Sequence, residues 1–343
     1  MGALVRAELE SFGLVVEEDG AAVETGAGCG NLLSRVPGSS ERWIGFAAHL
    51  DTVPHEGPIE VVLDGDTYRS AGNTILGADN KAAVAVLIEL AAEFSRRPGP
   101  VGIELLFTVA EETGLRGAFA FDRTALRADR LFVLDLAEEI GRVVTRSPFY
   151  HRLSAVVTGA EAHSGLVPEQ GRSAIVAAAR AISAMQLGRL DAETTANVGL
   201  IEGGSAANVI PGRCALVGEA RSLDEERAAE VVGTMAQAIA SAASEGGCEA
   251  EIETSVLHEG YSVPDDSPAL LLAEEALREC GFEAERVTTG GGSDANVFRG
   301  DGLDAILVAN GTFENHTPDE NVPRANLSAM LDVCRAIVRK GAG

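Results

Sequence analysis

A chain of 343 residues is longer than one ordinary hydrophobic core requires, and its length predicts two domains. Hydrophobic residues make up 46% and charged residues 23%, which excludes a disordered chain and indicates a globular protein. The 27 Lys and Arg against 52 Asp and Glu give a formal net charge of −25, which argues against nucleic acid and anionic membranes as partners.

The cysteines and the N-terminal segment indicate the cellular compartment in which the protein is expected. Five cysteines are scattered without a C-x-x-C pair, so neither a disulfide framework nor a zinc finger is expected, and free thiols in a reducing compartment are the plain interpretation. The opening MGALVRAELESFG lacks a continuous apolar core and is typical of an amphipathic helix, not of a signal peptide. With no run of about 18 apolar residues, no membrane span is expected. These features together predict a cytoplasmic protein.

The first part of the chain alternates between strand and helix patterns. Short apolar runs at 43–48 (WIGFAA), 103–109 (IELLFTV) and 131–136 (LFVLDL) are typical of strands covered on both faces of a sheet. Between the first two, residues 80–95 have the periodicity of a helix that ends at an Arg-Arg-Pro-Gly sequence. This alternation indicates a doubly wound α/β domain with a mixed sheet.

The middle of the chain has a different pattern. In order it predicts a strand at 152–158, a helix at 172–185, strands at 195–202 and 213–220, a helix at 223–245 and a strand at 249–256. The order β-α-β-β-α-β is that of a ferredoxin-like α+β domain. Residues 149–257 are therefore expected to form a satellite domain.

The last part of the chain returns to the α/β pattern. A helix at 267–280, an apolar strand at 304–309 and a closing helix at 324–340 are expected. The satellite domain is thus an insertion, and residues 1–148 together with 258–343 form the catalytic domain.

Ionisable residues gather where the predicted strands end. His49 and Asp51 follow the first strand, Glu111 and Glu112 follow the second, and Asp135 closes the third. Asp79 begins the helix at 80–95, and His316 follows the last strand. Because sites in open α/β sheets form at the carboxyl ends of the strands, these side chains are expected at one edge.

Two imidazoles and several carboxylates suit a pair of divalent ions, Zn²⁺ first and Co²⁺ or Mn²⁺ next. If Asp79 bridges two ions, one ion takes His49 and Asp135, and the other takes Glu112 and His316. Such ions lie about 3.5–4 Å apart in aminopeptidases and phosphatases. Glu111 is then free to act as the general base, and Asp51 can orient His49 through its other ring nitrogen.

At this point the sequence resembles the M20 family of metallopeptidases. The resemblance rests on the segments His49-Leu50-Asp51-Thr52-Val53-Pro54, Gly77-Ala78-Asp79-Asn80-Lys81, Glu111-Glu112-Thr113-Gly114, Ala162-His163-Ser164-Gly165, Ala207-Asn208-Val209-Ile210-Pro211 and Arg221-Ser222-Leu223-Asp224, with Asp135 and the late His316. The segment Gly290-Gly291-Gly292-Ser293-Asp294-Ala295-Asn296 is similar to the peptidase T-like (tripeptidase) branch.

The resemblance implies roles that spacing alone does not give. It implies a cis peptide bond after Asp79, a His163 that acts across a dimer interface on the scissile carbonyl, and an Arg221 and Asn208 that bind the substrate. Ser293 and Asp294 are further candidates for substrate contacts. The satellite domain would dimerise, and hinge closure between the domains would assemble the working site.

The predicted function is hydrolysis of amide bonds in short peptides by an aminopeptidase or tripeptidase. The alternatives are an N-acyl amino acid deacylase or carboxypeptidase on the same scaffold, and a metal-binding or peptide-binding protein without catalysis. Lys81 is expected to be a charge on the surface of its helix.

Overall fold

The computed structural model describes residues 1–342. These residues divide into two compact units. The first unit comprises Met1–Arg146, Ser262–Thr289 and the chain from Ser293 onward. The second comprises Ser147–Tyr261 together with Gly290–Gly292. Among the helices within residues 1–342, none is long and apolar enough to cross a lipid bilayer.

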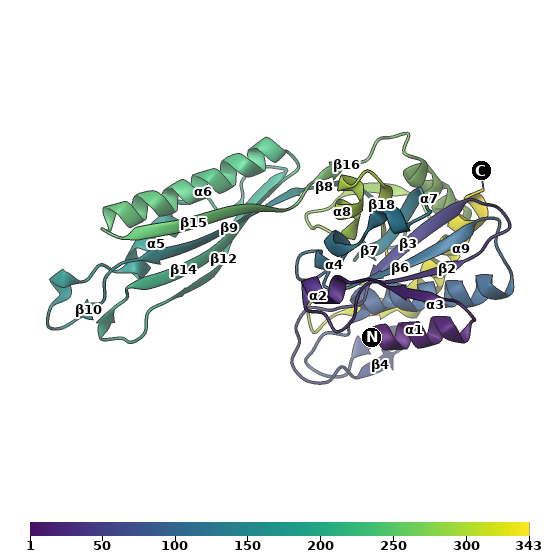
Figure 1. The fold of residues 1–343 in the computed structure, drawn as a ribbon, viewed down its shortest axis with the longest axis horizontal. Coiled ribbons are helices and arrows are strands. Elements are labelled where there is room, and N and C mark those ends of the chain that lie inside the picture. Colours follow the sequence, from purple (N-terminus) through teal and green to yellow (C-terminus); the bar gives the residue numbers. More distant parts are fainter. Residues whose placement is uncertain (343) are drawn as a thin grey trace. The chain divides into compact units, whose positions relative to one another are not determined.

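A nine-stranded mixed sheet forms the centre of the first unit (Figure 1). In sheet order its strands are β1 (Val16–Glu18), β2 (Leu32–Val36), β6 (Gly102–Thr108), β3 (Trp43–His49), β7 (Arg130–Leu136), β18 (Asp304–Ala309), β8 (Arg142–Ser147) and β16 (Tyr261–Ser262), and β17 (Glu285–Thr288) pairs with β8. The central strands β6, β3, β7 and β18 are parallel, whereas β2 and β8 run antiparallel beside them. Every residue of β6 is buried, as expected for a strand covered on both faces.

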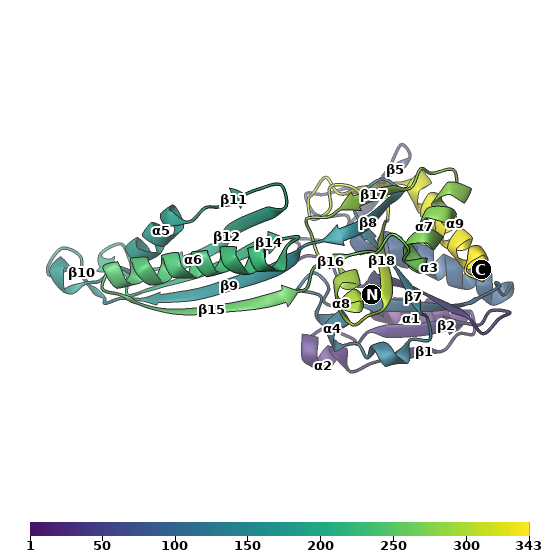
Figure 2. The same ribbon diagram turned by 90° about the horizontal axis from the view of Figure 1, so that it is seen from above.

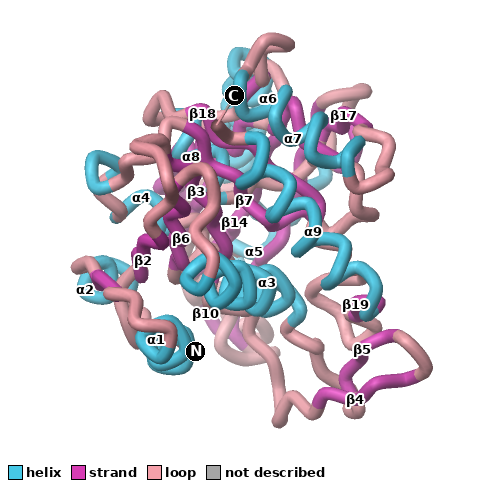
Figure 3. The backbone as a smooth tube through the Cα atoms, turned by 90° about the vertical axis from the view of Figure 1, so that its right-hand side faces the viewer, coloured by secondary structure: helices cyan, strands magenta, loops and turns pink. Residues whose placement is uncertain are grey.

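Helices cover both faces of this sheet (Figure 3). They are α1 (Gly2–Ser11), α2 (Ala21–Thr25), α3 (Ala78–Arg96), α4 (Arg116–Ala120), α7 (Pro268–Glu279), α8 (Asp294–Gly300) and α9 (Arg324–Lys340), with a 3₁₀ turn at Arg123–Ala125. Helix α3 packs on β3 and β7, α7 packs on β7 and β18, and α9 packs against both helices. Helices α4 and α8 contact each other on the other face, where Phe121 and Phe298 meet edge to face.

The expected fold class is confirmed. The four apolar segments correspond to β3, β6, β7 and β18, and the three helical segments to α3, α7 and α9. The sequence did not indicate a small three-stranded sheet of β4 (Val61–Asp64), β5 (Thr67–Ser70) and β19 (Asn321–Pro323). Strand β19 joins residues near the end of the chain to the β4–β5 hairpin.

The second unit has the ferredoxin-like topology. Its strands are β9 (Phe149–Thr158), β12 (Thr194–Gly203), β14 (Arg213–Ser222) and β15 (Glu249–His258), with the short strand β11 (Gly188–Arg189). The sheet order β11-β12-β14-β9-β15 places the first and last strands of the β-α-β-β-α-β unit side by side. Two further short strands, β10 (Ala162–His163) and β13 (Val209–Ile210), pair apart from this sheet, and a 3₁₀ turn spans Pro168–Gln170.

One face of the second unit's sheet carries its core. Helices α5 (Ala174–Ala184) and α6 (Glu225–Glu245) lie on this face (Figure 2). Ser173 and Asp224 cap the two helices by accepting backbone N–H groups of their first turns. The buried face of α5 consists of alanines, whereas that of α6 combines alanines with larger apolar side chains such as Met235. Both faces pack on inward-facing residues of β9 and β14 such as Leu153 and Leu216.

Candidate metal centre

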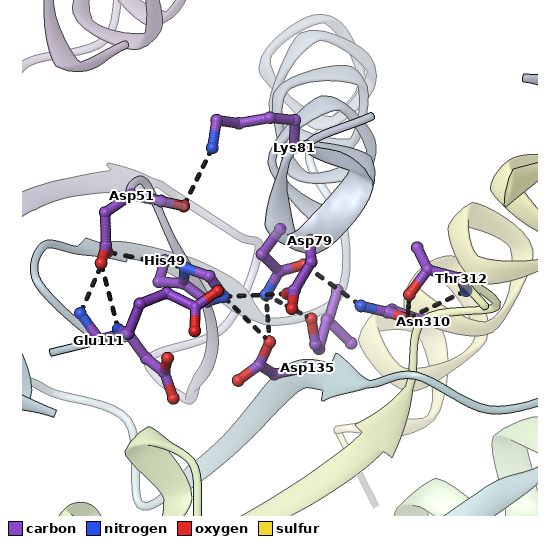
Figure 4. A network of polar contacts seen from close by, with 12 residues as sticks. His49, Asp51, Asp79, Lys81, Glu111, Asp135, Asn310 and Thr312 are labelled. Carbon is purple, nitrogen blue, oxygen red and sulfur yellow. Dashed lines mark hydrogen bonds and ion pairs between the residues drawn. The ribbon is translucent and has the colours of Figure 1, made fainter. Parts of the chain in front are cut away.

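Ionisable side chains converge at the carboxyl edge of the first unit's sheet (Figure 4). His49 is the last residue of β3, and Asp135 lies near the end of β7. The other members are Asp79 in the first turn of α3, Asp51 after β3, Glu111 and Glu112 after β6, and His316 between β18 and β19. All seven residues belong to the first unit, so the geometry among them is that of one compact body.

Two carboxylates share the imidazole of His49. The Nε2 atom lies 3.1 Å from Asp79 Oδ1 and 3.2 Å from Asp135 Oδ1. The side chain of His49 is 2% exposed, so this half of the site is closed to solvent.

A second imidazole meets the other oxygen of Asp79. The Nε2 atom of His316 lies 3.0 Å from Asp79 Oδ2 and 3.0 Å from Glu112 Oε1. The side chain of His316 is 50% exposed, so the site opens to solvent on this side. Asp79 therefore stands between the two histidines and directs one carboxylate oxygen toward each.

Asp51 fixes the loop that follows β6. Its two carboxylate oxygens accept the backbone N–H groups of Glu111 and Glu112, at 3.0 and 3.1 Å. Its Oδ1 lies 3.6 Å from His49 Nδ1, which is beyond hydrogen-bond distance. Asp51 thus joins the ends of β3 and β6 and lies close to the outer nitrogen of His49.

The crowded carboxylates shift one another's titration. Burial, partly offset by His49, raises the pKa of Asp135 to about 7. Burial also raises the pKa of Glu111 well above its ordinary value, with the charge of Asp135 adding to the effect. The result is a buried group of acids, two of which hold protons more tightly than free carboxyl groups do.

The pKa values of both histidines are raised as well. Burial alone would lower the pKa of His49, but the carboxylates of Asp135, Asp51 and Asp79 outweigh it and hold that pKa well above the ordinary value. Hydrogen bonds to Asp79 and Glu112 raise the pKa of His316 to about 10. In the absence of an ion, the carboxylates therefore favour the protonated imidazoles.

The donor set fits divalent metal ions. Ligand atoms of His49, Glu111 and Asp135 lie within 4.8 Å of one another, and so do those of His49, Asp79 and Glu112. Imidazole nitrogens and carboxylate oxygens are the ligands that Zn²⁺ takes at catalytic sites. A cation in this position would also remove the repulsion among the buried acids. The residues present thus form a candidate metal site.

Supporting residues that the sequence analysis missed surround the ligands. Asn80 donates from Nδ2 to Asp135 Oδ1 at 2.9 Å and to the carbonyl of Leu134. The peptide bond between Asp79 and Asn80 is cis, as the resemblance implied. Asn310 in turn donates to Asn80 Oδ1 at 3.4 Å. The sequence pattern does not reveal these amides, although Asn80 directly follows the predicted ligand Asp79.

Lys81 is not the surface charge that its place in the helix suggested. Its Nζ donates to the carbonyl oxygen of Asp51 at 3.0 Å, and burial lowers its pKa. That expectation was wrong because the loop after β3 passes over the first turn of α3. Lys81 therefore holds the Asp51 loop against the helix.

Three predicted residues belong to the second unit. His163 is exposed in β10, where its Nδ1 accepts the backbone N–H of Gly165 at 3.2 Å. Asn208 is exposed, and its carbonyl accepts the N–H of Ser164. Arg221 lies in β14, stacks on the ring of Tyr150 at 4.2 Å and forms an ion pair with Glu219 at 3.1 Å. Their proposed roles toward substrate stay predictions.

The segment around the three glycines is built into both units. Ser293 caps α8 with its side chain, and Asp294 Oδ2 accepts the hydroxyl of Thr108 at 2.5 Å. Both side chains are buried, and their contact with substrate stays a prediction. Gly292 packs so closely on His258 that a Cβ atom there would lie 2.2 Å from the ring.

Comparisons with known proteins place this fold and site in a class. A model described as a peptidase dimerisation domain matches residues 151–247, and one described as peptidase family M28 matches residues 31–163. Together with the converging ligands, these matches define a metallopeptidase.

Full-length similarities narrow the class to a family. An uncharacterised protein of Bacillus subtilis, YqjE, is 36% identical over 99% of this chain and 92% of its own length. Aminopeptidase PepT from Bacillus cereus, whose crystal structure is known, is 35% identical in sequence to this chain. Its structure superposes with a TM-score of 0.86, and the match covers 100% of this chain and 92% of PepT. A tripeptidase from Staphylococcus aureus, whose crystal structure is known, is 32% identical in sequence to this chain. Its structure superposes with a TM-score of 0.91, and the match covers 99% of this chain and 92% of the tripeptidase. The chain belongs to the M20 family of metallopeptidases.

Proposed function

We propose that this protein is a two-metal aminopeptidase that acts on short peptides, with tripeptides as its main substrates. The observation that carries the proposal is the division of the two Asp79 oxygens between His49 and His316. One carboxylate between two imidazoles, each beside a further carboxylate, is the ligand arrangement that a pair of ions needs. The similarity to an aminopeptidase and a tripeptidase supports the choice of substrate.

Five residues would hold the ions. Asp79 would bridge them, His49 and Asp135 would hold one, and Glu112 and His316 would hold the other. We propose Zn²⁺ as the physiological ion, with Co²⁺ or Mn²⁺ as substitutes. When bound, the ions supply positive charge that polarises the peptide carbonyl and lowers the pKa of the attacking water.

Glu111 would move the proton during hydrolysis. Its carboxylate lies beside His49 and Asp135 but is not needed in the bridged ligand set. Its raised pKa suits a group that takes a proton from water and later gives it to the leaving amine. Asp51 would keep Glu111 in place, because it accepts the backbone N–H of that residue.

The second unit would serve binding and assembly. The match to a peptidase dimerisation domain supports a homodimer formed through this unit. Within the dimer, His163 would polarise the scissile carbonyl, and Asn208 and Arg221 would bind the backbone or carboxylate of the peptide. The five free thiols support a reducing, cytoplasmic location.

The direct test is hydrolysis of an unblocked tripeptide by protein loaded with Zn²⁺ or Co²⁺, with a chelator-treated control. Release of the N-terminal residue that stops on chelation would support the proposal. Folded, metal-loaded protein that cleaves N-acyl amino acids, and no tripeptide, would instead identify a deacylase on the same scaffold.

A further inference from the structure

The loop that contains His316 also contains a buried acid, Glu320, that none of the roles above uses. The residue is 1% exposed, and the donors of its hydrogen bonds are backbone N–H groups. A buried carboxylate is costly unless its charge is satisfied. Its partners therefore indicate why an acid is placed there.

Three backbone N–H groups satisfy this carboxylate. Oε2 accepts Leu76 N and Gly77 N, each at 2.8 Å, and Oε1 accepts Asp79 N at 2.8 Å. Gly77 has φ of 72°, a left-handed conformation that brings successive N–H groups to one side of the chain. The three donors form a concave anion site at the start of α3, and Glu320 fills it.

The loop that carries Glu320 is also held in place. The loop closes where Phe313 and Asn321 exchange backbone hydrogen bonds of 2.9 and 3.0 Å, and His316 lies within it. Directly after Glu320, β19 pairs with β5. Glu320 therefore joins the start of α3, which carries the metal-ligand candidate Asp79, to the loop that carries the candidate His316.

We infer that Glu320 is a positioning residue for the metal centre, which sets the bridging carboxylate of Asp79 relative to His316 without contacting an ion. This inference rests on the proposed two-metal site. A hydrogen bond to the main chain of Asp79 fixes the origin of that side chain, and residues that orient ligands in this way control metal affinity.

The test compares Glu320→Gln with Asp319→Asn. Gln keeps the size of the side chain but replaces one accepting oxygen with an N–H₂ group. This group cannot accept the backbone N–H bonds that the carboxylate accepts. Asp319 is exposed in the same loop, so its substitution removes the same charge without touching the contact. Zn²⁺ affinity is measured by competition with a chromophoric chelator, the Co²⁺ site by its visible absorption spectrum, and folding by circular dichroism.

Glu320→Gln should lower Zn²⁺ affinity by roughly 10- to 100-fold and change the Co²⁺ spectrum, while Asp319→Asn should match the wild type. If Glu320→Gln does not fold, Glu320→Asp, which keeps the charge on a shorter side chain, is measured in the same way and should weaken binding. A folded variant at position 320 that melts earlier but keeps wild-type affinity and spectrum would overturn the inference. A wild-type protein that binds no ion would instead overturn the proposed function, and the inference with it.

Discussion

Two adjacent glutamates, Glu111 and Glu112, have different surroundings at this site. Glu112 lies 3.0 Å from His316, in the position of a ligand. Glu111 is buried beside His49 and Asp135, and burial raises its pKa. Asp51 accepts the backbone N–H of both residues and so fixes the turn that separates them. The proposed roles of base for Glu111 and ligand for Glu112 therefore rest on the different neighbours that each side chain meets beyond the same turn.

Glu111→Gln should lower kcat by roughly 10²- to 10⁴-fold, because the amide cannot accept the proton from water. The variant should keep the wild-type metal content, measured by atomic emission after dialysis. Glu112→Gln, the matched change one residue later, should instead weaken metal binding. An active Glu111→Gln protein would contradict the role of base, and loss of metal from this variant would make Glu111 a ligand.

At the scale of single residues, the sequence predicts the ionisable side chains that stand at the ends of apolar strands. His49, Glu112 and Asp135 could be predicted because each follows an apolar run. Glu320 could not, since its partner Leu76 precedes it by 244 residues and only the folded chain brings the two together. Lys81 was misassigned for a similar reason, as a loop distant from its helix covers it.

At the scale of elements, the strand and helix order of both units followed from periodicity. The short strands β4, β5 and β19 did not, because the residues of β4 are all exposed and give no alternation. Within β6, Glu104 is fully buried and is satisfied by Arg35 and by the backbone N–H groups of Arg127 and Ala128. Such long-range pairing allows an acid inside an apolar strand, and a sequence pattern does not reveal it.

The end of β15 should make the protein sensitive to acid. Burial of His258 lowers its pKa to about 4, below the value of about 6.5 in an unfolded chain. Between pH 6.5 and 4 the unfolded chain binds a proton that the native state does not, so the free energy of unfolding falls as the pH falls. The loss from this residue should approach about 3 kcal/mol at pH 4.

Urea unfolding of the wild type and His258→Gln between pH 7 and 4 measures this contribution. The variant should lose less stability across that window than the wild type. His55→Gln, which removes an exposed histidine, is the control and should behave as the wild type does. Identical pH dependence in wild type and His258→Gln would contradict the account.

At the scale of the whole molecule, ion binding should be coupled to proton release. The pKa of His316 is raised to about 10, so its imidazole carries a proton at pH 7 when no ion is bound. The neighbouring carboxylates also raise the pKa of His49 and so favour its protonated form. A metal ion binds only the neutral imidazole nitrogen, so binding must displace these protons.

Calorimetric titration of Zn²⁺ at pH 7, repeated in buffers with different ionisation enthalpies, counts the protons. About one proton or more should be released per chain when the site fills, because His316 must lose its proton. A titration that releases none would show that His316 does not become a ligand.

The most direct test of the central claim is the number of ions that the folded chain binds. Equilibrium dialysis of the chelator-treated protein against Zn²⁺, followed by metal analysis, should give two ions per chain, because Asp79 has one oxygen for each histidine site. One ion per chain, or none, in correctly folded protein would contradict the two-metal account.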